Sequence, residues 1–372
     1  MERKEQAILR AIKAALSLTP EAMVNVLPDG AHASVMEITG FTKGSGTKVT
    51  IRANFGPERV DNIGAVSLLL SQFAAIMPDT FAATGDKNLV QLKSGGMTSD
   101  VMIRANDTVA VPHALSGSDP ILMRFPASSL KPLVCFRPDF TREATSVVHL
   151  DIAKWADGIK AGMVAVATNG HILTRAPVIM VSGGGTKAKE MATGCSVPLP
   201  AMQLAAKIAG ILGKDQGIEM FTFDNIATMA IGGVNLSFNF WKATTLPWRQ
   251  VRPEKSDHWV EVPAKQVAKS LNELAKVVGR TEPVAIDASH GQARLVQLIG
   301  PGEEGASTTM LDAFGTMAMG TNFGIQLQYW QQVIKSLSGT VRVTLPTTSG
   351  KPLTFSSTDN DDVEIVVMPK RA

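Results

Sequence analysis

The chain has 372 residues, of which 45% are hydrophobic, and its formal net charge is only +3. At roughly 100–200 residues per domain this length predicts two to four domains, and the apolar content excludes a disordered or low-complexity chain. No apolar run reaches the ~20 residues that a membrane-spanning helix needs, and the charged start of the chain lacks the apolar core of a signal peptide. The two cysteines, Cys135 and Cys195, cannot form a disulfide framework, so we expect a cytoplasmic protein.

Hydrophobic periodicity predicts short amphipathic helices that alternate with pairs of β-strands. In the first third of the chain, helices are expected at residues 2–16 and 60–77, and strands at 33–38, 48–54, 89–93 and 100–105. In the middle third, helices are expected at 128–137 and 201–212, and strands at 147–152, 163–168, 221–230 and 234–241. In the last third, helices are expected at 264–278 and 327–337, and strands at 284–287, 293–299, 341–345, 353–356 and 363–368.

The same order of elements therefore recurs three times, at roughly 124 residues per repeat. It is a repeat of pattern and not of residue identity. We predict an α+β fold of three similar domains, at residues 1–124, 125–254 and 255–372. Two unrelated α+β domains are the alternative.

The common catalytic signatures are missing from the sequence. There is no phosphate-binding P-loop, no Gly-x-Ser-x-Gly elbow and no Cys-x-x-Cys, and the six histidines never pair at the spacing of a helical zinc site. A hydrolase that uses His171 with Asp151 is a distant alternative, because no nucleophile is positioned near them. We predict a protein that is not an enzyme and that needs no cofactor or metal.

Basic residues gather on the polar faces of three predicted helices. In the helix at 264–278, Val267, Leu271 and Leu274 share one face, and lysines cluster on the opposite face with no acid among them. One such face is usually only solvated, but several in a repeated architecture predict sequence-independent contact with the phosphates of duplex DNA. The candidate DNA-binding residues are Arg3, Arg10, Lys13, Lys207, Lys214, Lys265, Lys269, Lys276 and Arg280.

Three motifs resemble a known family. Residues 166–173 (VATNGHIL) are similar to the Val-Ala-Thr-Asp-Gly-His-Arg-Leu segment of the bacterial β sliding clamp, the processivity subunit of DNA polymerase III. Residues 246–253 (LPWRQVRP) resemble that family's Phe-Pro-Asp-Tyr-Arg-Arg-Val-x-Pro linker, and residues 366–372 (VVMPKRA) resemble its Val-Val-Met-Pro-Met-Arg-Leu ending. The motifs cover residues 125–372, whereas residues 1–124 match only in pattern. The chain thus resembles a divergent clamp, of bacterial or phage origin.

The resemblance implies a function. A head-to-tail homodimer would close a six-domain ring around double-stranded DNA and tether the replicative DNA polymerase, the clamp loader and other proteins with clamp-binding peptides. The alternative is a clamp-fold, peptide-binding regulator or decoy that does not encircle DNA.

The resemblance also implies a peptide-binding groove between the second and third predicted domains. Its residues would be Leu150, Thr168, Gly170, His171, Leu173, Pro247, Gln250, Val251, Tyr329, Val366, Val367, Met368 and Pro369. Two family arginines are replaced, by Ile172 and Gln250, so we expect acidic peptides to bind less well.

Ring closure would need strand pairing between the first domain of one chain and the third of its partner. Val101 and Ile103 alternate on one face of residues 100–104, as in an edge strand that packs against a partner. Their expected mates are Val284 and Ile286 of the partner chain.

Overall fold

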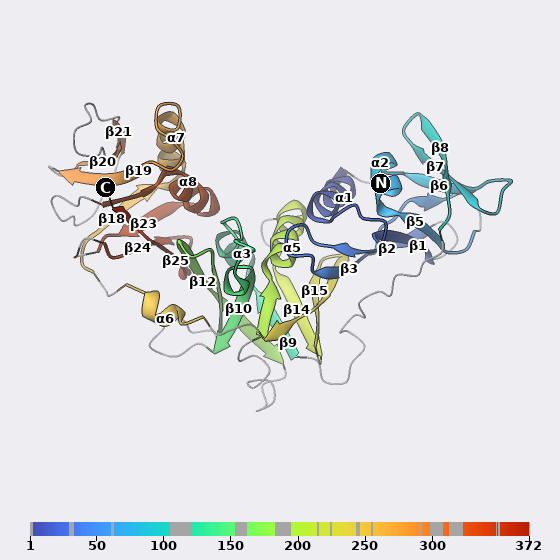
Figure 1. The fold of residues 1–372 in the computed structure, drawn as a ribbon, viewed down its shortest axis with the longest axis horizontal. Helices are drawn as coiled ribbons and strands as arrows, with labels where there is room; N and C mark the ends of the chain where they lie inside the picture. The colour runs from blue at the N-terminus through green and yellow to red at the C-terminus, as the bar shows by residue number, and fades with distance from the viewer. Residues whose placement is uncertain are drawn as a thin grey trace. The chain divides into compact units, whose positions relative to one another are not determined.

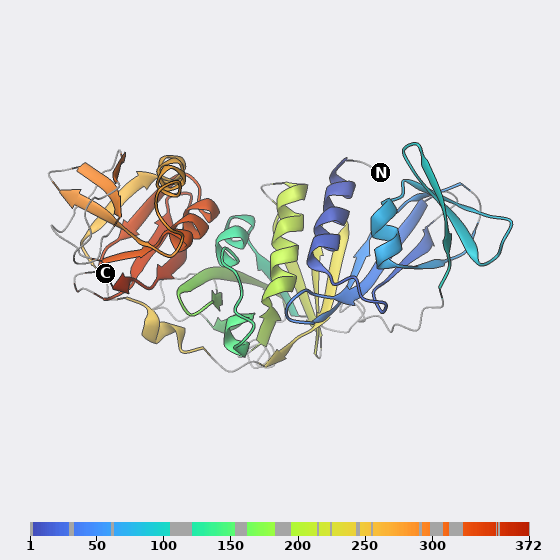
Figure 2. The ribbon, with the colours of Figure 1, turned by 45° about the horizontal axis from the view of Figure 1, so that its top comes forward.

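The computed structural model describes residues 3–29, 33–60, 63–104, 121–152, 162–182, 195–213, 216–223, 225–242, 246–253, 256–289, 292–297, 308–311, 323–346, 348 and 350–371. These residues form two compact units, coloured along the chain in Figures 1 and 2. Unit 1 contains Met1–Ala127 and Ile179–Lys242, and unit 2 contains Ser128–Val178 and Ala243–Ala372.

Unit 1 is built on one antiparallel sheet. Its strands pair in the order β5-β1-β2-β3-β16-β15-β14-β9-β12. Their bounds are β5 (Val66–Leu69), β1 (Met23–Asp29), β2 (Ala33–Phe41), β3 (Lys48–Ala53), β16 (Val234–Asn239), β15 (Ile226–Ile231), β14 (Ile218–Phe223), β9 (Ile121–Phe125) and β12 (Ile172–Ser182). A short antiparallel pair, β13 (Cys195–Pro198) with β17 (Trp241–Lys242), accompanies it.

A smaller sheet and three helices complete unit 1. The sheet has the order β4-β6-β7-β8, with β4 (Glu58–Arg59), β6 (Thr80–Ala83), β7 (Leu89–Ser94) and β8 (Met97–Met102). The helices are α1 (Arg3–Ala15), α2 (Leu70–Ile76) and α5 (Leu199–Leu212). Helices α1 and α5 pack side by side (Figures 1 and 2), and α1 buries its apolar face, which includes Ile8 and Ile12.

Unit 2 contains two antiparallel sheets. The first has the order β10-β11-β12-β25-β24-β23-β18, and the second has the order β21-β20-β19-β22-β26. The bounds in the first sheet are β10 (Val147–Ile152), β11 (Met163–Thr168), β25 (Asn360–Val367), β24 (Leu353–Ser357), β23 (Thr340–Thr344) and β18 (Trp259–Pro263). Those in the second are β21 (Thr308–Leu311), β20 (Gln292–Gln297), β19 (Pro283–Ser289), β22 (Phe323–Gln326) and β26 (Lys370–Arg371).

The helices of unit 2 pack against these sheets. They are α3 (Ala127–Leu133), a 3₁₀ turn η2 (Glu143–Thr145), α6 (Trp248–Val251), α7 (Ala264–Leu274) and α8 (Leu327–Ser336). Trp330 of α8 is central to the core, because its ring meets Phe355 edge-on at 5.1 Å and its indole N–H donates to the Val284 carbonyl at 2.8 Å.

The middle third of the chain is shared between the two units. Strand β16 pairs with β3 of the first third, and β12 pairs with β25 of the last third, so each half of the middle third joins a different unit. The expected division into three domains stays a prediction. Cys135 and Cys195 are not joined in a disulfide, and none of the described helices has the length and apolar character needed to cross a membrane.

Two predicted helices are wrong in part. Residues 66–69 form strand β5 and not the start of a helix, because Val66 and Leu68 are buried with a period of two. The helix predicted at 264–278 ends at Leu274, and a turn follows in which Val277 N donates to Leu274 O. One predicted strand is also wrong in part: residues 221–230 do not form a single strand but belong to two, β14 and β15, which pair as an antiparallel hairpin.

Candidate functional site

The hairpin between β11 and β12 is held by side chains of the first motif. The Asn169 carboxamide oxygen accepts the backbone N–H groups of His171 at 3.0 Å and Ile172 at 2.8 Å. Thr168 Oγ1 donates to the Ile172 carbonyl at 2.8 Å and accepts the Gly170 N–H at 3.0 Å. Gly170 has φ +88°, a left-handed conformation that favours glycine. These three residues therefore build the turn that presents His171 to solvent.

The C-terminal motif lies against this hairpin. Strand β25 pairs with β12 in a register that joins Val367 to Ile172 and Val366 to Leu173. Beyond the strand, the Met368 N–H donates to the His171 carbonyl at 2.9 Å. The structure thus brings together two motifs that are about 200 residues apart in the sequence.

An aromatic pair flanks the hairpin. The His171 ring stacks on Tyr329 of α8, with 5.3 Å between the ring centroids and 23° between the planes. Partial burial raises the pKa of the Tyr329 hydroxyl above its usual value. His171 is exposed, and Met368, whose backbone N–H donates to the His171 carbonyl, is 37% exposed.

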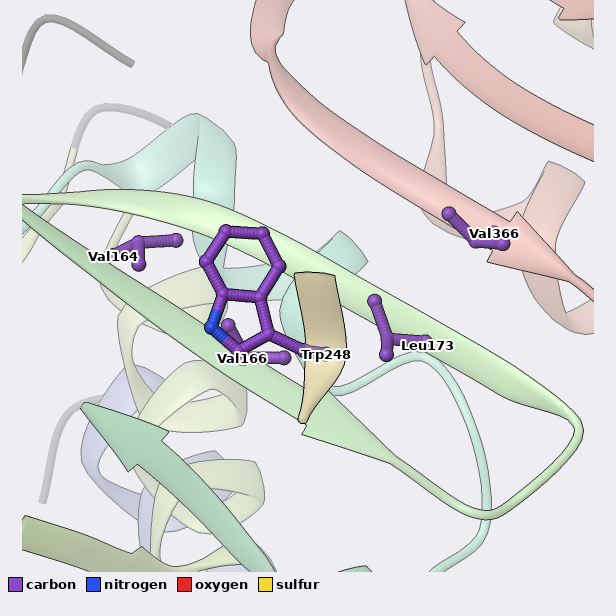
Figure 3. Close-up of a cluster of buried hydrophobic side chains, with 5 residues drawn as sticks. All are labelled: Val164, Val166, Leu173, Trp248 and Val366. Carbon is purple, nitrogen blue, oxygen red and sulfur yellow. The ribbon is translucent and has the colours of Figure 1, made fainter. Parts of the chain in front are cut away.

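The linker motif contributes a buried indole. Trp248 of α6 is 2% exposed and packs with Val164, Val166, Leu173 and Val366 (Figure 3). The partly buried Leu246 packs against the same cluster. Each of these contacts is apolar, so the cluster forms a small core on the β11–β12 hairpin.

Asp151 fastens the linker to β10. Its carboxylate accepts the Trp248 indole N–H at 3.0 Å and an Arg249 guanidinium N–H at 2.7 Å. The Arg249 guanidinium also lies 4.3 Å from the centroid of the Trp248 ring and donates to the Ile152 carbonyl. Partial burial acts to raise the pKa of Asp151, but the bonds from Trp248 and Arg249 and the arginine charge outweigh it and hold the pKa below the usual value.

The predicted groove residues fall into two sets. Thr168 and four apolar residues are buried, whereas the other residues are exposed or partly exposed. The buried apolar residues are Leu150, Leu173, Val366 and Val367. The exposed or partly exposed residues are Gly170, His171, Pro247, Gln250, Val251, Tyr329, Met368 and Pro369.

Trp248 was not among the predicted site residues, although it is buried at this site. The predicted apolar walls do not face open space, because Leu173 and Val366 are buried in one cluster with the indole and Leu150 and Val367 are buried in the sheet. Trp248 stands within the linker motif, where the family has no tryptophan, and this replacement was the available signal.

The position of Ile172 also corrects an expectation. Its side chain is 0% exposed, so this residue does not border the groove in place of a family arginine. Gln250 is exposed, so the predicted loss of a positive charge, and with it the weaker binding of acidic peptides, applies to this position.

Three cationic candidates, two on α7 and one in the turn that follows it, line a shallow hollow of about 500 Å³. Lys265, Lys269 and Lys276 line it, but so does Glu273, which corrects the expectation that no acid lies among the lysines. Arg280 is exposed in the turn beyond the helix.

The candidate DNA-binding residues in unit 1 differ in whether their side chains are exposed or already hydrogen-bonded within the protein. Arg10 and Lys207 are exposed, whereas Lys13 Nζ donates to the Ala74 carbonyl at 2.8 Å. This carbonyl is in the last turn of α2, where a cation complements the helix dipole. Lys13 is therefore a capping residue. Arg3 begins α1, and Lys214 lies outside the described residues.

One of the two predicted interface strands is wrong. Strand β8 ends the order of its sheet, as an edge strand does, but Val101 is 7% exposed and turns toward the core of unit 1. Strand β19 is internal, because Val284 pairs with Gln297 of β20 and with Ile325 of β22. Val284 and Ile286 are also buried, so they are not a free edge for a partner strand.

Among the described residues, Asp151 and His171 do not come together with a nucleophile as a catalytic site would require. Asp151 is bound to Trp248 and Arg249, and His171 stacks on Tyr329, so the hydrolase alternative gains no support. Over the part of the chain that the structure describes, no three His, Cys, Asp or Glu side chains gather as metal ligands.

Comparison with known proteins found solved structures only. No family model and no curated protein matches the chain. A DnaN sliding clamp (DNA polymerase III subunit beta) from Bartonella birtlesii is 18% identical, with 99% of this chain and 98% of that chain covered and a TM-score of 0.72. The DNA polymerase III subunit beta from Borrelia burgdorferi is 10% identical, with 99% and 97% covered and a TM-score of 0.72.

A third structure agrees with these two. The beta subunit of DNA polymerase from Streptococcus pyogenes is 14% identical, with 99% and 98% covered and a TM-score of 0.69. The resemblance seen in the three motifs is thus confirmed at the level of the fold, and it extends to the first third of the chain. This protein has the fold of the DNA polymerase III β sliding clamps.

Proposed function

We propose that this protein is a DNA sliding clamp that encircles duplex DNA as a homodimeric ring and tethers the replicative polymerase and other proteins with clamp-binding peptides. The observation that carries the proposal is the match of the whole chain, end to end, to sliding-clamp structures. The role is non-catalytic, because a tether needs a closed shape and docking surfaces and no reacting groups.

Two further features support the proposal. The lysines of α7 offer phosphate contacts that carry no base information, as a sliding protein requires. His171 and Tyr329 offer two stacked rings, and Met368, which is bonded to His171 through the backbone, offers a flexible thioether; this combination suits docking of varied short peptides.

A threading experiment tests encirclement without a clamp loader. The protein is incubated with a linear duplex that has streptavidin on one biotinylated end, and the second end is then blocked in the same way. A ring that has threaded onto the DNA should stay bound at 1 M salt, where purely electrostatic binding is lost. Cutting the duplex with a restriction enzyme should release it.

The outcomes separate the two candidate functions. Salt-resistant retention that ends on cutting supports a clamp. Loss at high salt with both ends blocked contradicts encirclement, and a protein that still binds peptides would then be the regulator or decoy.

Peptide docking is tested at Met368. Met368→Ala should weaken binding of a fluorescent peptide with apolar anchors by about 1–2 kcal/mol, as expected for an interface anchor. Leu18→Ala, which removes a half-exposed apolar side chain of unit 1, is the control and should leave the peptide affinity unchanged. Truncation from Val367 is a poor test, because Val367 is buried and pairs with Ile172 and Leu353. Equal affinities for Met368→Ala and wild type would exclude this surface.

A further inference from the structure

The apolar part of the proposed peptide site is already occupied by the chain itself. Leu173 and Val366 were expected to form the walls of an open pocket, yet both are buried in the apolar cluster that contains Trp248 (Figure 3). The indole is 2% exposed, and Leu173 and Val366 are 5% and 1% exposed, so these two expected walls present almost no surface to a second side chain. An incoming anchor and Trp248 would need the same volume, because protein interiors are close-packed.

The segment that bears Trp248 is short and locally folded. Helix α6 has four residues, and its Trp248 and Gln250 N–H groups donate to Leu246 and Pro247 within the same segment. Its described attachments to the sheet are made by side chains. Trp248 and Arg249 bind Asp151, and Arg252 pairs with Glu364 of β25 at 3.2 Å. Such a segment can move away from the sheet without breaking strand pairing.

The remaining part of the site is accessible while Trp248 is in place. Met368 and Val251 are each more than a third exposed, and His171 at the tip of the hairpin is exposed. A peptide can therefore make a first contact on this outer surface, whereas full insertion of an apolar anchor requires the indole to leave.

We propose that Trp248 is a latch, an intramolecular occupant that competes with the apolar anchor of a partner peptide and is held closed by Asp151. This inference rests on the proposed peptide-docking function. The latch lowers the apparent affinity by the fraction of molecules in which it is open, since a ligand that binds only the open form is penalised by that fraction. A partner that supplies several contacts overcomes the latch, and a weak single-anchor peptide does not.

The test compares peptide affinities in variants that open or keep the latch. The probe is a fluorescein-labelled nonapeptide with two leucines and one phenylalanine in a Ser/Lys background, together with a version in which these three residues are alanine. Trp248→Ala empties the pocket and should lower Kd at least tenfold. Asp151→Ala leaves the indole but removes its acceptor and should lower Kd severalfold.

Two controls separate the latch from general effects. Trp248→Phe refills the pocket with another large ring, so its Kd should stay nearer to wild type than to Trp248→Ala. Trp259→Ala removes a tryptophan that also has an arginine, Arg342, stacked at 4.4 Å, but from β18, and it should leave Kd unchanged. Circular dichroism checks that each variant is folded.

A second measurement keeps the inference falsifiable if Trp248→Ala does not fold. In protein labelled with fluorotryptophan, the Trp248 resonance is assigned by its loss in Trp248→Phe. Saturating peptide should shift it to the position of a solvent-exposed indole. Peptide binding that leaves this resonance unmoved, or a Kd for Trp248→Ala that is equal to or weaker than wild type, overturns the latch while the docking function stands. If no variant prefers the anchored peptide to its alanine version, the proposed docking function fails and the latch fails with it.

Discussion

At the scale of single residues, Ile172 and Gln250 occupy positions where the resembling family has arginine, but their environments are opposite. Ile172 lies in β12 with no exposed surface, and Gln250 is exposed on α6. The same replacement therefore has a different meaning at each position. At Ile172 the change is accommodated by the core, and at Gln250 it alters the charge beside the proposed peptide site.

Restoring each arginine should separate the two positions. Ile172→Arg places a charge in the sheet core and should lower the free energy of unfolding by on the order of 3 kcal/mol or more. Gln250→Arg should change it by less than about 0.5 kcal/mol and should tighten binding of an acidic peptide. Urea denaturation and peptide titration measure both effects. An Ile172→Arg protein as stable as wild type would show that this side chain reaches solvent.

At the scale of elements, α7 shows how one helix divides its two faces. Val267 and Leu271 are buried, and Lys265 and Lys269 are exposed on the opposite face, as its period predicts. The helix ends at Leu274, and Val278 is buried beyond a short turn. Lys276 thus reaches the same hollow from the turn and not from the helix.

Charge reversal on this face tests its contact with DNA. Lys265→Glu with Lys269→Glu and Lys276→Glu should weaken binding equally for all sequences and should lower the slope of log K against log salt by roughly 0.9 per lost contact. Glu273→Gln should act in the opposite direction, because it removes the acid among the three lysines. Fluorescence anisotropy over a salt series measures the slopes.

A matched control makes this result specific. Lys87→Glu with Lys93→Glu and Lys351→Glu changes the net charge by the same amount at exposed positions outside α7. Equal losses in the two triple variants would mean that only the net charge of the protein matters and that α7 is not a DNA-facing helix.

At the scale of the whole molecule, the structure changes how dimer formation should be tested. Val101 of β8 is buried in its own unit, whereas Met97 and Met102 of the same edge strand are 47% and 48% exposed. Two half-exposed methionines on an edge strand are available to a partner chain, and Val101 is not. The expected interface residues of β8 are therefore its methionines.

Met97→Asp with Met102→Asp should convert the dimer into folded monomers in sedimentation equilibrium. Leu18→Asp is the control, because Leu18 is 46% exposed in unit 1 but outside β8, and it should leave the dimer intact. Val101→Asp should instead lower the thermal stability, since it buries a charge. A wild type that is monomeric at micromolar concentration would contradict the ring.

Local structure and the resemblance of the fold could be predicted from the sequence. The 3.6-residue spacing of apolar residues predicted the ends of α1 and α8 to within one residue. This was possible because the spacing shows that one face of the helix is buried, whichever segment it packs against. The Thr168–Gly170 turn was recognisable as a motif, since its hydrogen bonds are all within five residues. Three such motifs in order sufficed to indicate the sliding-clamp fold.

What each apolar or charged face packs against could not be predicted from the sequence and required the folded structure. Periodicity shows that Leu173 and Val366 have an apolar side, but not that Trp248 covers it. It likewise cannot show that β19 has neighbours on both edges, or that Lys13 caps α2 across a separation of 61 residues. The physical reason is that burial and pairing depend on contacts between distant segments, which a local pattern permits without specifying the partner.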